Sequence, residues 1–120
     1  MEIAIIAHDG KKAEMVQFLN KHKETLLKNN IKLISTGTTG SHAEKAGFKV
    51  IKYLSGPIGG DAQIAARVAE RKCNLVLFFR DSLAKHPHEP DIIMLLRICD
   101  VHNIPLATNP ATADMLIKAL

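Results

Sequence analysis

Leu75-Val76-Leu77-Phe78-Phe79 is the stretch that decides the fold of this 120-residue chain. Five consecutive apolar residues, bounded by polar ones, predict a strand that is buried on both faces. Residues 3–7 have the same character, and residues 31–35, 49–53 and 104–107 predict three shorter or weaker strands. We therefore expect a sheet of five strands.

The segments between these strands carry the apolar spacing of helices. In residues 90–102, Ile92, Leu95, Leu96 and Cys99 mark one helical face. Similar spacing predicts helices over residues 11–28, 61–72 and 111–120, and a short helix near residues 41–46 that Gly47 would cap. Strands that alternate with helices predict an α/β fold, with three α/β/α layers around a mainly parallel sheet.

Length and composition favour a single globular domain over residues 1–120. Hydrophobic residues make up 47% of the chain and charged residues 23%, which excludes a disordered chain. The longest apolar runs have five residues, so no membrane span or export signal is expected. Two cysteines, Cys73 and Cys99, are too few for a disulfide scaffold. We expect both as buried residues on helices, in a cytoplasmic protein.

The charge pattern favours a small anionic ligand over a nucleic acid. The formal net charge is +4, lysines outnumber arginines twelve to four, and aromatic residues are only 4% of the chain. A nucleic-acid surface usually needs clustered arginines and stacking aromatic rings. No nucleic-acid or membrane partner is therefore expected.

Polar clusters follow each of the five predicted strands. Ligands of parallel α/β sheets bind beyond the carboxyl ends of the strands, so these clusters should meet at one edge. The clusters are His8-Asp9, residues 36–40, residues 55–61, residues 81–91 and Thr108-Asn109.

Two of these clusters are rich in glycine and precede a helix. Thr36-Gly37-Thr38-Thr39-Gly40 offers hydroxyls and N–H groups where a helix dipole favours an anion, although a capped turn has the same composition. Residues 55–61 contain three glycines, typical of close backbone approach to a ligand. Asp61 ends this second cluster, where it is either a helix-capping carboxylate or a base whose pKa a dry site or an anion must raise.

His86-Pro87-His88-Glu89-Pro90-Asp91 contains metal-ligand residue types without tetrahedral spacing, so no metal site is expected. Two prolines instead fix His88 ahead of a helix, where an uncharged imidazole could donate a hydrogen bond to a substrate oxygen. The alternative is that His88 is an ordinary histidine of a surface loop. Lys12 is a candidate phosphate-binding charge. Asp9 alone lacks the second carboxylate that a phospho-receiver domain would need for magnesium.

In six ordered stretches that cover nearly the whole chain, the sequence resembles the methylglyoxal synthase family. The stretches are Ile5-Ile6-Ala7-His8-Asp9, Thr36-Gly37-Thr38-Thr39-Gly40, residues 55–61, Phe78-Phe79-Arg80-Asp81, Pro87-His88-Glu89-Pro90-Asp91 and residues 104–109. The resemblance implies a cofactor-free lyase that converts dihydroxyacetone phosphate to methylglyoxal and inorganic phosphate. It also implies a homohexamer that phosphate inhibits.

The family's functional residues map onto this chain by position. Asp61 matches the catalytic carboxylate and His88 the active-site histidine, which also binds substrate. The remaining substrate-binding positions are His8, Lys12, Thr36, Gly37, Thr38, Thr39, Ser55 and Gly56. Asp9, Asp81 and Asp91 are supporting carboxylates, and Arg97 matches an arginine without an assigned role.

A non-catalytic alternative has the same fold. Related domains bind phosphorylated metabolites as allosteric segments, and they share the threonine-rich turn. Such a sensor needs neither a base nor a proton shuttle, so Asp61 and His88 together favour the enzyme.

Overall fold

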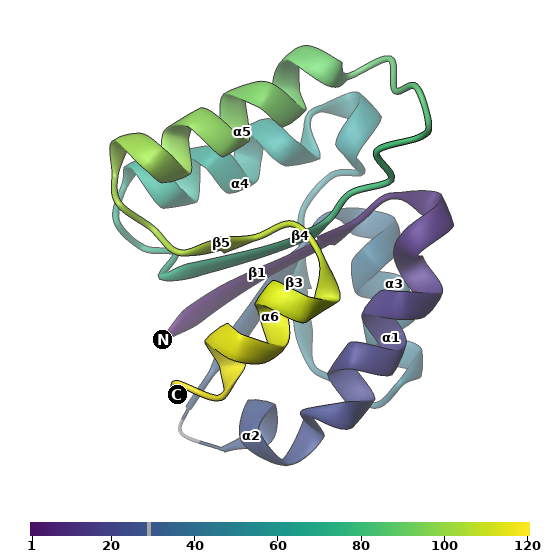
Figure 1. The fold of residues 1–120 in the computed structure, drawn as a ribbon, viewed down its shortest axis with the longest axis vertical. Helices are drawn as coiled ribbons and strands as arrows, with labels where there is room; N and C mark the ends of the chain where they lie inside the picture. The colour runs from purple at the N-terminus through teal and green to yellow at the C-terminus, as the bar shows by residue number, and fades with distance from the viewer. Residues whose placement is uncertain (29) are drawn as a thin grey trace.

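The chain folds as a five-stranded sheet between two layers of helices, in a computed structural model that describes residues 1–28 and 30–120 (Figure 1). The strands are β1 (Glu2–Ala7), β2 (Lys32–Ser35), β3 (Val50–Lys52), β4 (Leu75–Phe79) and β5 (Leu106–Ala107). Their order is β3-β2-β1-β4-β5, and every neighbouring pair is parallel. The predicted fold class is confirmed, and the sheet is wholly parallel.

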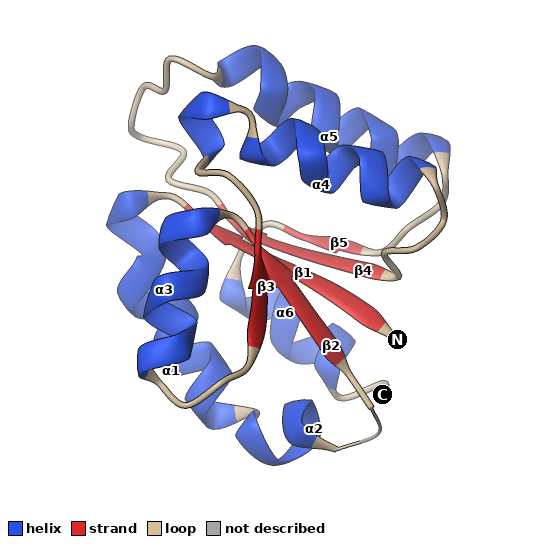
Figure 2. Ribbon diagram, turned by 180° about the vertical axis from the view of Figure 1, so that it is seen from behind, coloured by secondary structure: helices blue, strands red, loops and turns tan. Residues whose placement is uncertain are grey.

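The helices cover both faces of the sheet. They are α1 (Lys12–Lys21), α2 (Lys23–Leu27), α3 (Gly37–Lys45), α4 (Gly60–Ala69), α5 (Glu89–Val101) and α6 (Pro110–Ile117), with short 3-10 helices η1 (Asp9–Lys11) and η2 (Gly56–Ile58). Helices α4 and α5 lie on one face, and α1, α3 and α6 lie on the other (Figures 1 and 2).

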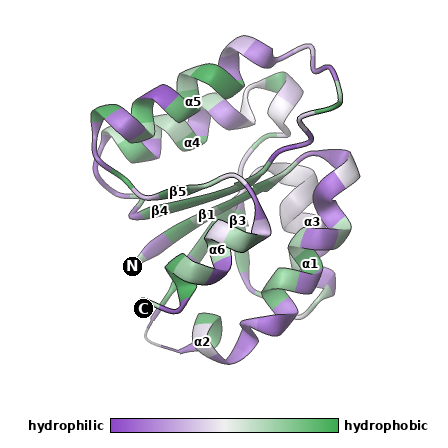
Figure 3. Cartoon of the chain, viewed as in Figure 1, coloured by the Kyte–Doolittle hydropathy of each residue, from purple (hydrophilic) through white to green (hydrophobic). Residues whose placement is uncertain are grey.

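Alternation along β1 explains why the sheet needs two helical layers. Ile3 and Ile5 join a buried cluster with Phe18 of α1, whereas Ile6 points the other way, into a cluster with Ile64 of α4. Figure 3 shows β4 as apolar, and β1 as apolar beyond its hydrophilic first residue, Glu2. Burying one such side chain contributes about 1.5–3 kcal/mol, so both faces must be covered.

The sequence predicts one continuous helix over residues 11–28, and this is wrong, because the helix is broken at His22. The backbone of His22 leaves the helical region, with φ −106° and ψ 19°. Its ring packs 4.7 Å from the ring of Phe18, and its Nε2 lies 2.6 Å from Oδ1 of Asp114 in α6. This contact with α6 accompanies a bend that local periodicity does not reveal.

Several other boundaries differ from the sequence prediction. Helix α3 begins at Gly37, so most of the threonine-rich turn is helical. The predicted outer strands 49–53 and 104–107 contract to three and two residues, because edge strands pair on one side only. Cys73 is buried but lies between α4 and β4 rather than on a helix.

The strand order reverses between β1 and β4, because β2 and β3 follow β1 on one side and β5 follows β4 on the other. Such a switch point opens a crevice at the carboxyl ends of the strands. Within residues 1–28 and 30–120, no helix combines the length and apolar character needed to cross a membrane.

Candidate active site

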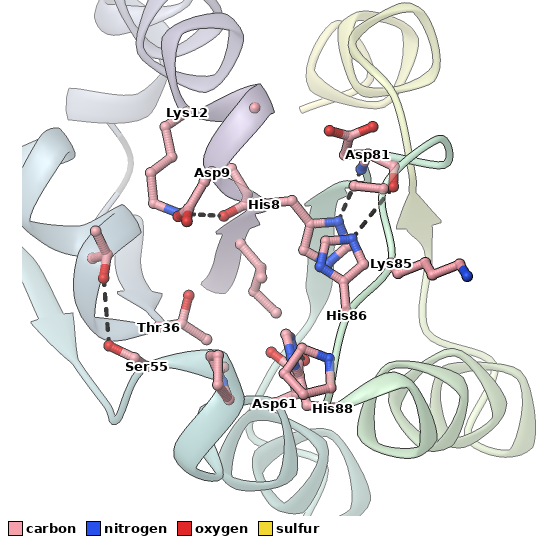
Figure 4. A pocket seen from close by; sticks show the side chains of 18 residues that line it. His8, Asp9, Lys12, Thr36, Ser55, Asp61, Asp81, Lys85, His86 and His88 are labelled. Atoms are coloured by element: carbon pink, nitrogen blue, oxygen red, sulfur yellow. Dashed lines mark hydrogen bonds and ion pairs between the residues drawn. The ribbon is translucent and has the colours of Figure 1, made fainter.

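A cavity of about 390 Å³ opens at this switch point (Figure 4). Segments that follow β1, β2, β3 and β4 all reach it, as the positions of the polar clusters predict. The predicted site residues that line it are His8, Asp9, Lys12, Thr36, Thr38, Ser55, Gly56, Asp61, Asp81 and His88. Four of the five polar clusters therefore meet in one place.

The fifth cluster lies elsewhere. Thr108 and Asn109 line a neighbouring cavity of about 330 Å³, together with Lys11 and Arg80. The Asn109 side chain accepts a hydrogen bond from the Thr112 N–H at 3.0 Å and so caps α6. All five clusters follow the carboxyl ends of parallel strands, as predicted, but Thr108 and Asn109 line this second cavity rather than the first.

Asp61 is a buried carboxylate at the start of α4. The residue is 1% exposed, and within the described part of the chain neither of its carboxylate oxygens has a hydrogen-bond partner. It is therefore not the helix cap that its position also allowed. Burial raises the pKa of Asp61, and nearby Asp91 raises it further, against the opposing effect of His88 and His86. A carboxylate with a raised pKa and free oxygens can accept a proton.

His88 occupies the N-cap position of α5, and its carbonyl accepts the N–H of Asp91 at 3.0 Å. Its ring Nε2 lies 3.6 Å from Oδ2 of Asp61. Gly56 makes this approach possible, because a β-carbon there would lie 2.9 Å from His88 Nε2 and 3.4 Å from Asp61 Oδ1. The pair thus shares a wall of the cavity that only a glycine leaves open.

His8 follows β1 and is held by the loop after β4. The Asp81 N–H donates to its Nδ1 at 2.8 Å, so Nδ1 is the unprotonated nitrogen and Nε2 carries the ring hydrogen. Among the described residues, Nε2 has no partner. Burial, and then the charges of His86, His88, Arg80 and Lys12, lower the pKa of His8 to about 4. His8 is therefore an uncharged donor at neutral pH.

Lys12 lies in the first turn of α1 beside the mouth of the cavity. Its Nζ donates to the Ala7 carbonyl at 2.7 Å and to Asp9 Oδ1 at 2.9 Å. An ammonium group has three hydrogens, so one is left for a ligand. The hydrogen bond and charge of Lys12 lower the pKa of the exposed Asp9 carboxyl.

The start of α3 faces the loop after β3. Thr38 Oγ1 lies 3.4 Å from Ser55 Oγ, and Thr36 is the N-cap residue of the helix. The first turn of a helix leaves N–H groups without partners inside the helix, which favours an anion. Hydroxyls and N–H groups therefore gather on the side of the cavity next to Lys12.

Gly37 and Thr39 lie behind this wall rather than on it. The Gly37 N–H donates to the Leu54 carbonyl at 3.2 Å. Thr39 is buried, and its Oγ1 accepts the Ala7 N–H at 3.1 Å and donates to the Ala7 carbonyl at 3.3 Å. Both residues tie neighbouring elements together, and neither lines the cavity.

The remaining predicted residues differ in their distance from the site. The Asp81 carboxylate accepts the Leu83 N–H at 3.2 Å, and Gly10 lies so close that a β-carbon there would meet Asp81 Oδ2 at 2.7 Å. Asp91 lies in the first turn of α5, near enough to Asp61 to raise its pKa, and does not line the cavity. Arg97 is exposed on α5 and lines neither cavity.

The sequence prediction left out two polar residues of the cavity wall, Lys85 and His86. His86 stacks on His8, with ring centroids 3.7 Å apart and planes 26° from parallel. Its place in a histidine-rich motif was the available signal, but the interpretation of that motif gave a role only to His88. Across residues 1–28 and 30–120, no group of three or more His, Cys, Asp or Glu side chains is arranged to hold a metal ion.

These features define a class of site. A buried base faces an imidazole at the switch point of a parallel α/β sheet, and an anion-binding helix start and a lysine lie across the cavity. Such a site suits proton abstraction from a small, negatively charged carbonyl compound.

Comparison with known proteins identifies the family. Residues 14–108 match the family model described as the MGS-like domain. The chain is 55% identical over 119 residues to a methylglyoxal synthase of Clostridium botulinum (strain Eklund 17B / Type B), covering 98% of both chains. It is 57% identical over 121 residues to a methylglyoxal synthase of Thermoanaerobacterium thermosaccharolyticum, covering 100% of this chain and 89% of the relative.

A solved structure gives the same result. The crystal structure of methylglyoxal synthase from Elizabethkingia anophelis NUHP1 matches with a TM-score of 0.89 and 41% sequence identity, over 97% of this chain and 76% of that one. The chain belongs to the methylglyoxal synthase family.

Proposed function

We propose that this chain is a carbon–oxygen lyase that converts dihydroxyacetone phosphate to methylglyoxal and inorganic phosphate. The observation that carries the proposal is the buried, unpartnered carboxylate of Asp61, 3.6 Å from the His88 ring at the cavity wall within the described structure. The relatives of this chain and the matching solved structure are named methylglyoxal synthase.

Asp61 is the base in the first step. Its carboxylate removes a proton from the hydroxymethyl carbon of the substrate, and the electron pair moves onto the carbonyl oxygen to give an enediolate. General base catalysis of this kind typically accelerates a reaction about 10²–10⁴-fold. Burial raises the pKa of Asp61, which strengthens it as a base, and a bound phosphate dianion would raise the pKa further.

His88 and His8 serve the developing oxyanion. Moving a proton between the two enediol oxygens requires an uncharged imidazole, which has one donor and one acceptor nitrogen. His88 occupies the N-cap position of α5, and its side chain lines the cavity beside Asp61. His8 presents an N–H from Nε2, whose partner in the complex would be a substrate oxygen.

Phosphate leaves in the last step. The second hydroxyl of the enediol gives up its proton and becomes the aldehyde, the double bond shifts by one carbon, and the carbon–oxygen bond to phosphate breaks. The proton passes to the departing phosphate, which leaves as hydrogen phosphate. The resulting enol then tautomerises to methylglyoxal. Departure requires that this bond lie out of the enediolate plane, so that its antibonding orbital overlaps the π system.

The phosphate group would be held by the cluster opposite Asp61. Lys12 supplies a charge, and Thr36, Thr38 and Ser55 supply hydroxyls. Gly56 lies beside Asp61 and His88 instead, where it would let the backbone approach the substrate closely. Lys12 and the hydroxyls would hold the phosphate out of plane and stabilise the dianion as it departs. No step requires a cofactor.

A phosphorylated-metabolite sensor without chemistry is the alternative. It would use the threonine-rich helix start and Lys12, but it offers no reason to bury an unpartnered carboxylate beside an imidazole, because that burial costs free energy.

We also propose that phosphate inhibits as product and that the protein assembles as a homo-oligomer, with a hexamer as the expected form. The cytoplasmic location stays a prediction.

Incubation with dihydroxyacetone phosphate tests the proposal. We expect inorganic phosphate and a dicarbonyl product to appear together, at a rate proportional to protein concentration. If the substrate binds at saturating concentration but neither product forms above the protein-free rate, the chain is the non-catalytic sensor.

A further inference from the structure

His86 is a cavity residue to which the proposed reaction gives no task. It lies in the loop between β4 and α5, is half-buried, and lines the same cavity as His8 and His88. The three imidazoles form a compact group: His86 stacks on His8, and the His88 ring centroid lies 6.1 Å from His8 and 5.6 Å from His86 (Figure 4).

One residue, Asp81, holds both stacked rings. Its N–H donates to His8 Nδ1 at 2.8 Å, and its carbonyl oxygen lies 3.4 Å from His86 Nε2. A single loop residue therefore fixes the two rings relative to each other. Because the Asp81 N–H can only donate, a proton added at His8 Nδ1 would break this bond.

We propose that His86 is a positioning residue for His8: by stacking on that ring it keeps His8 uncharged and oriented with Nε2–H available to the substrate. The covering ring removes water from one face of His8, and a charge on either imidazole disfavours a charge on the other at 3.7 Å. The consequence for catalysis rests on the proposed function, because it requires His8 to bind a substrate oxygen.

Other charged groups around the two rings are of both signs, and they come from every element that packs against them. Arg80 and Lys12 disfavour protonation of His8, as do His86 and His88, and together with burial they lower the pKa of His8 to about 4. The surrounding titratable and charged side chains are Asp9, Lys12, Asp61, Arg80, Asp81, Lys85 and His88. Removing His86 removes both a neighbouring imidazole that lowers the pKa of His8 and a ring that covers it, and both changes favour a proton on His8.

Nuclear magnetic resonance titration of the histidine rings tests this directly, without any need for turnover. In the wild type we expect His8 to keep its Nε2–H tautomer down to about pH 4. In His86→Ala and His86→Gln the midpoint should rise toward the ordinary value of about 6.5. His86→Phe keeps a covering ring and should lie closer to the wild type. The control His42→Ala removes an exposed imidazole on α3 and should leave His8 unchanged.

Activity gives the second readout. If the His8 midpoint reaches about 6.5, only about one tenth of the protein has an uncharged His8 at pH 5.5. The ratio of kcat/KM in His86→Ala to that in the wild type should then fall about tenfold between pH 8 and pH 5.5. Using this ratio cancels the titration of the substrate phosphate. Because His86 also lowers the pKa of Asp61, the ring titration, and not the ratio alone, isolates the effect on His8.

The outcomes separate this inference from the proposed function. An unchanged His8 midpoint in both His86→Ala and His86→Gln overturns the inference, even if the chain is an active lyase. A midpoint in His86→Phe as high as in His86→Ala overturns stacking as the cause. A raised midpoint in a chain without lyase activity supports the role of His86 and rejects the proposed function.

Discussion

Replacing Asp61 with asparagine should make the protein inactive and more stable at the same time. Asparagine keeps the shape of the side chain but cannot take a proton from carbon. The loss of a general base predicts a fall in kcat of about 10²–10⁴-fold. A phosphorylated mimic of the enediolate should still bind, because the phosphate-binding groups across the cavity are intact.

The gain in stability follows from the burial of Asp61. A buried group left without hydrogen bonds costs about 1–3 kcal/mol, and more when it is charged. Within the described structure both carboxylate oxygens are buried without hydrogen-bond partners. A neutral amide still lacks those partners but avoids the extra cost of a buried charge, so the gain should be on the order of 1 kcal/mol. For a chain of this size, each kcal/mol corresponds to about 3–6 °C in Tm.

The stability gained by Asp61→Asn should depend on pH. Burial raises the pKa of Asp61 in the folded protein above its value in the unfolded chain, so the charged form destabilises the fold at higher pH. The advantage of Asp61→Asn should therefore be complete above the folded pKa. It should shrink as pH falls through that value and be absent below the unfolded pKa.

Urea unfolding from pH 4 to pH 8, together with phosphate release, measures both effects. Asp100→Asn, which changes an exposed carboxylate on α5, is the matched control and should alter stability by less than about 0.5 kcal/mol. Near-wild-type turnover by Asp61→Asn would refute its role as base. A variant less stable than the wild type at pH 8 would refute the idea that the carboxylate lacks partners.

Three further substitutions probe separate parts of the site. His88→Gln should lower kcat with little change in KM, and an unchanged kcat in steady-state assays would remove His88 from the mechanism. Lys12→Met should raise KM about 10–100-fold, as expected for the loss of a hydrogen bond to a charged group, whereas Lys11→Met should change it less than twofold; equal effects would argue against Lys12 as the phosphate contact. Thr39→Val breaks two hydrogen bonds to the Ala7 backbone and should cost about 1–3 kcal/mol in urea unfolding, and an unchanged midpoint would show that these bonds contribute nothing.

Apolar runs and polar clusters were sufficient to predict the sheet and most of the cavity. Five apolar residues bounded by polar ones, as in residues 75–79, indicate a buried strand. Parallel strands then place the residues that follow them at one edge of the sheet. Gly56 is an example of what composition can predict: the density of glycines in residues 55–61 indicated that the backbone closely approaches another group. The structure supplies the partners, which are Asp61 and His88.

Contacts between segments far apart in the chain could not be predicted from the sequence. The break at His22 coincides with its contact to Asp114, 92 residues away, and periodicity describes only neighbours in the chain. Thr39 looked like a ligand-binding hydroxyl, yet its hydrogen bonds go to Ala7. The stack of His86 on His8 depends on the path of a loop that prolines stiffen but whose course they do not specify.

Phosphorus magnetic resonance of dihydroxyacetone phosphate mixed with the protein is the most direct test of whether phosphate departs from the enediolate. We expect the substrate signal to be replaced by that of inorganic phosphate alone, with one dicarbonyl molecule formed per phosphate released. Conversion to glyceraldehyde 3-phosphate, with the phosphate retained on carbon, would contradict an out-of-plane phosphate and indicate an isomerase.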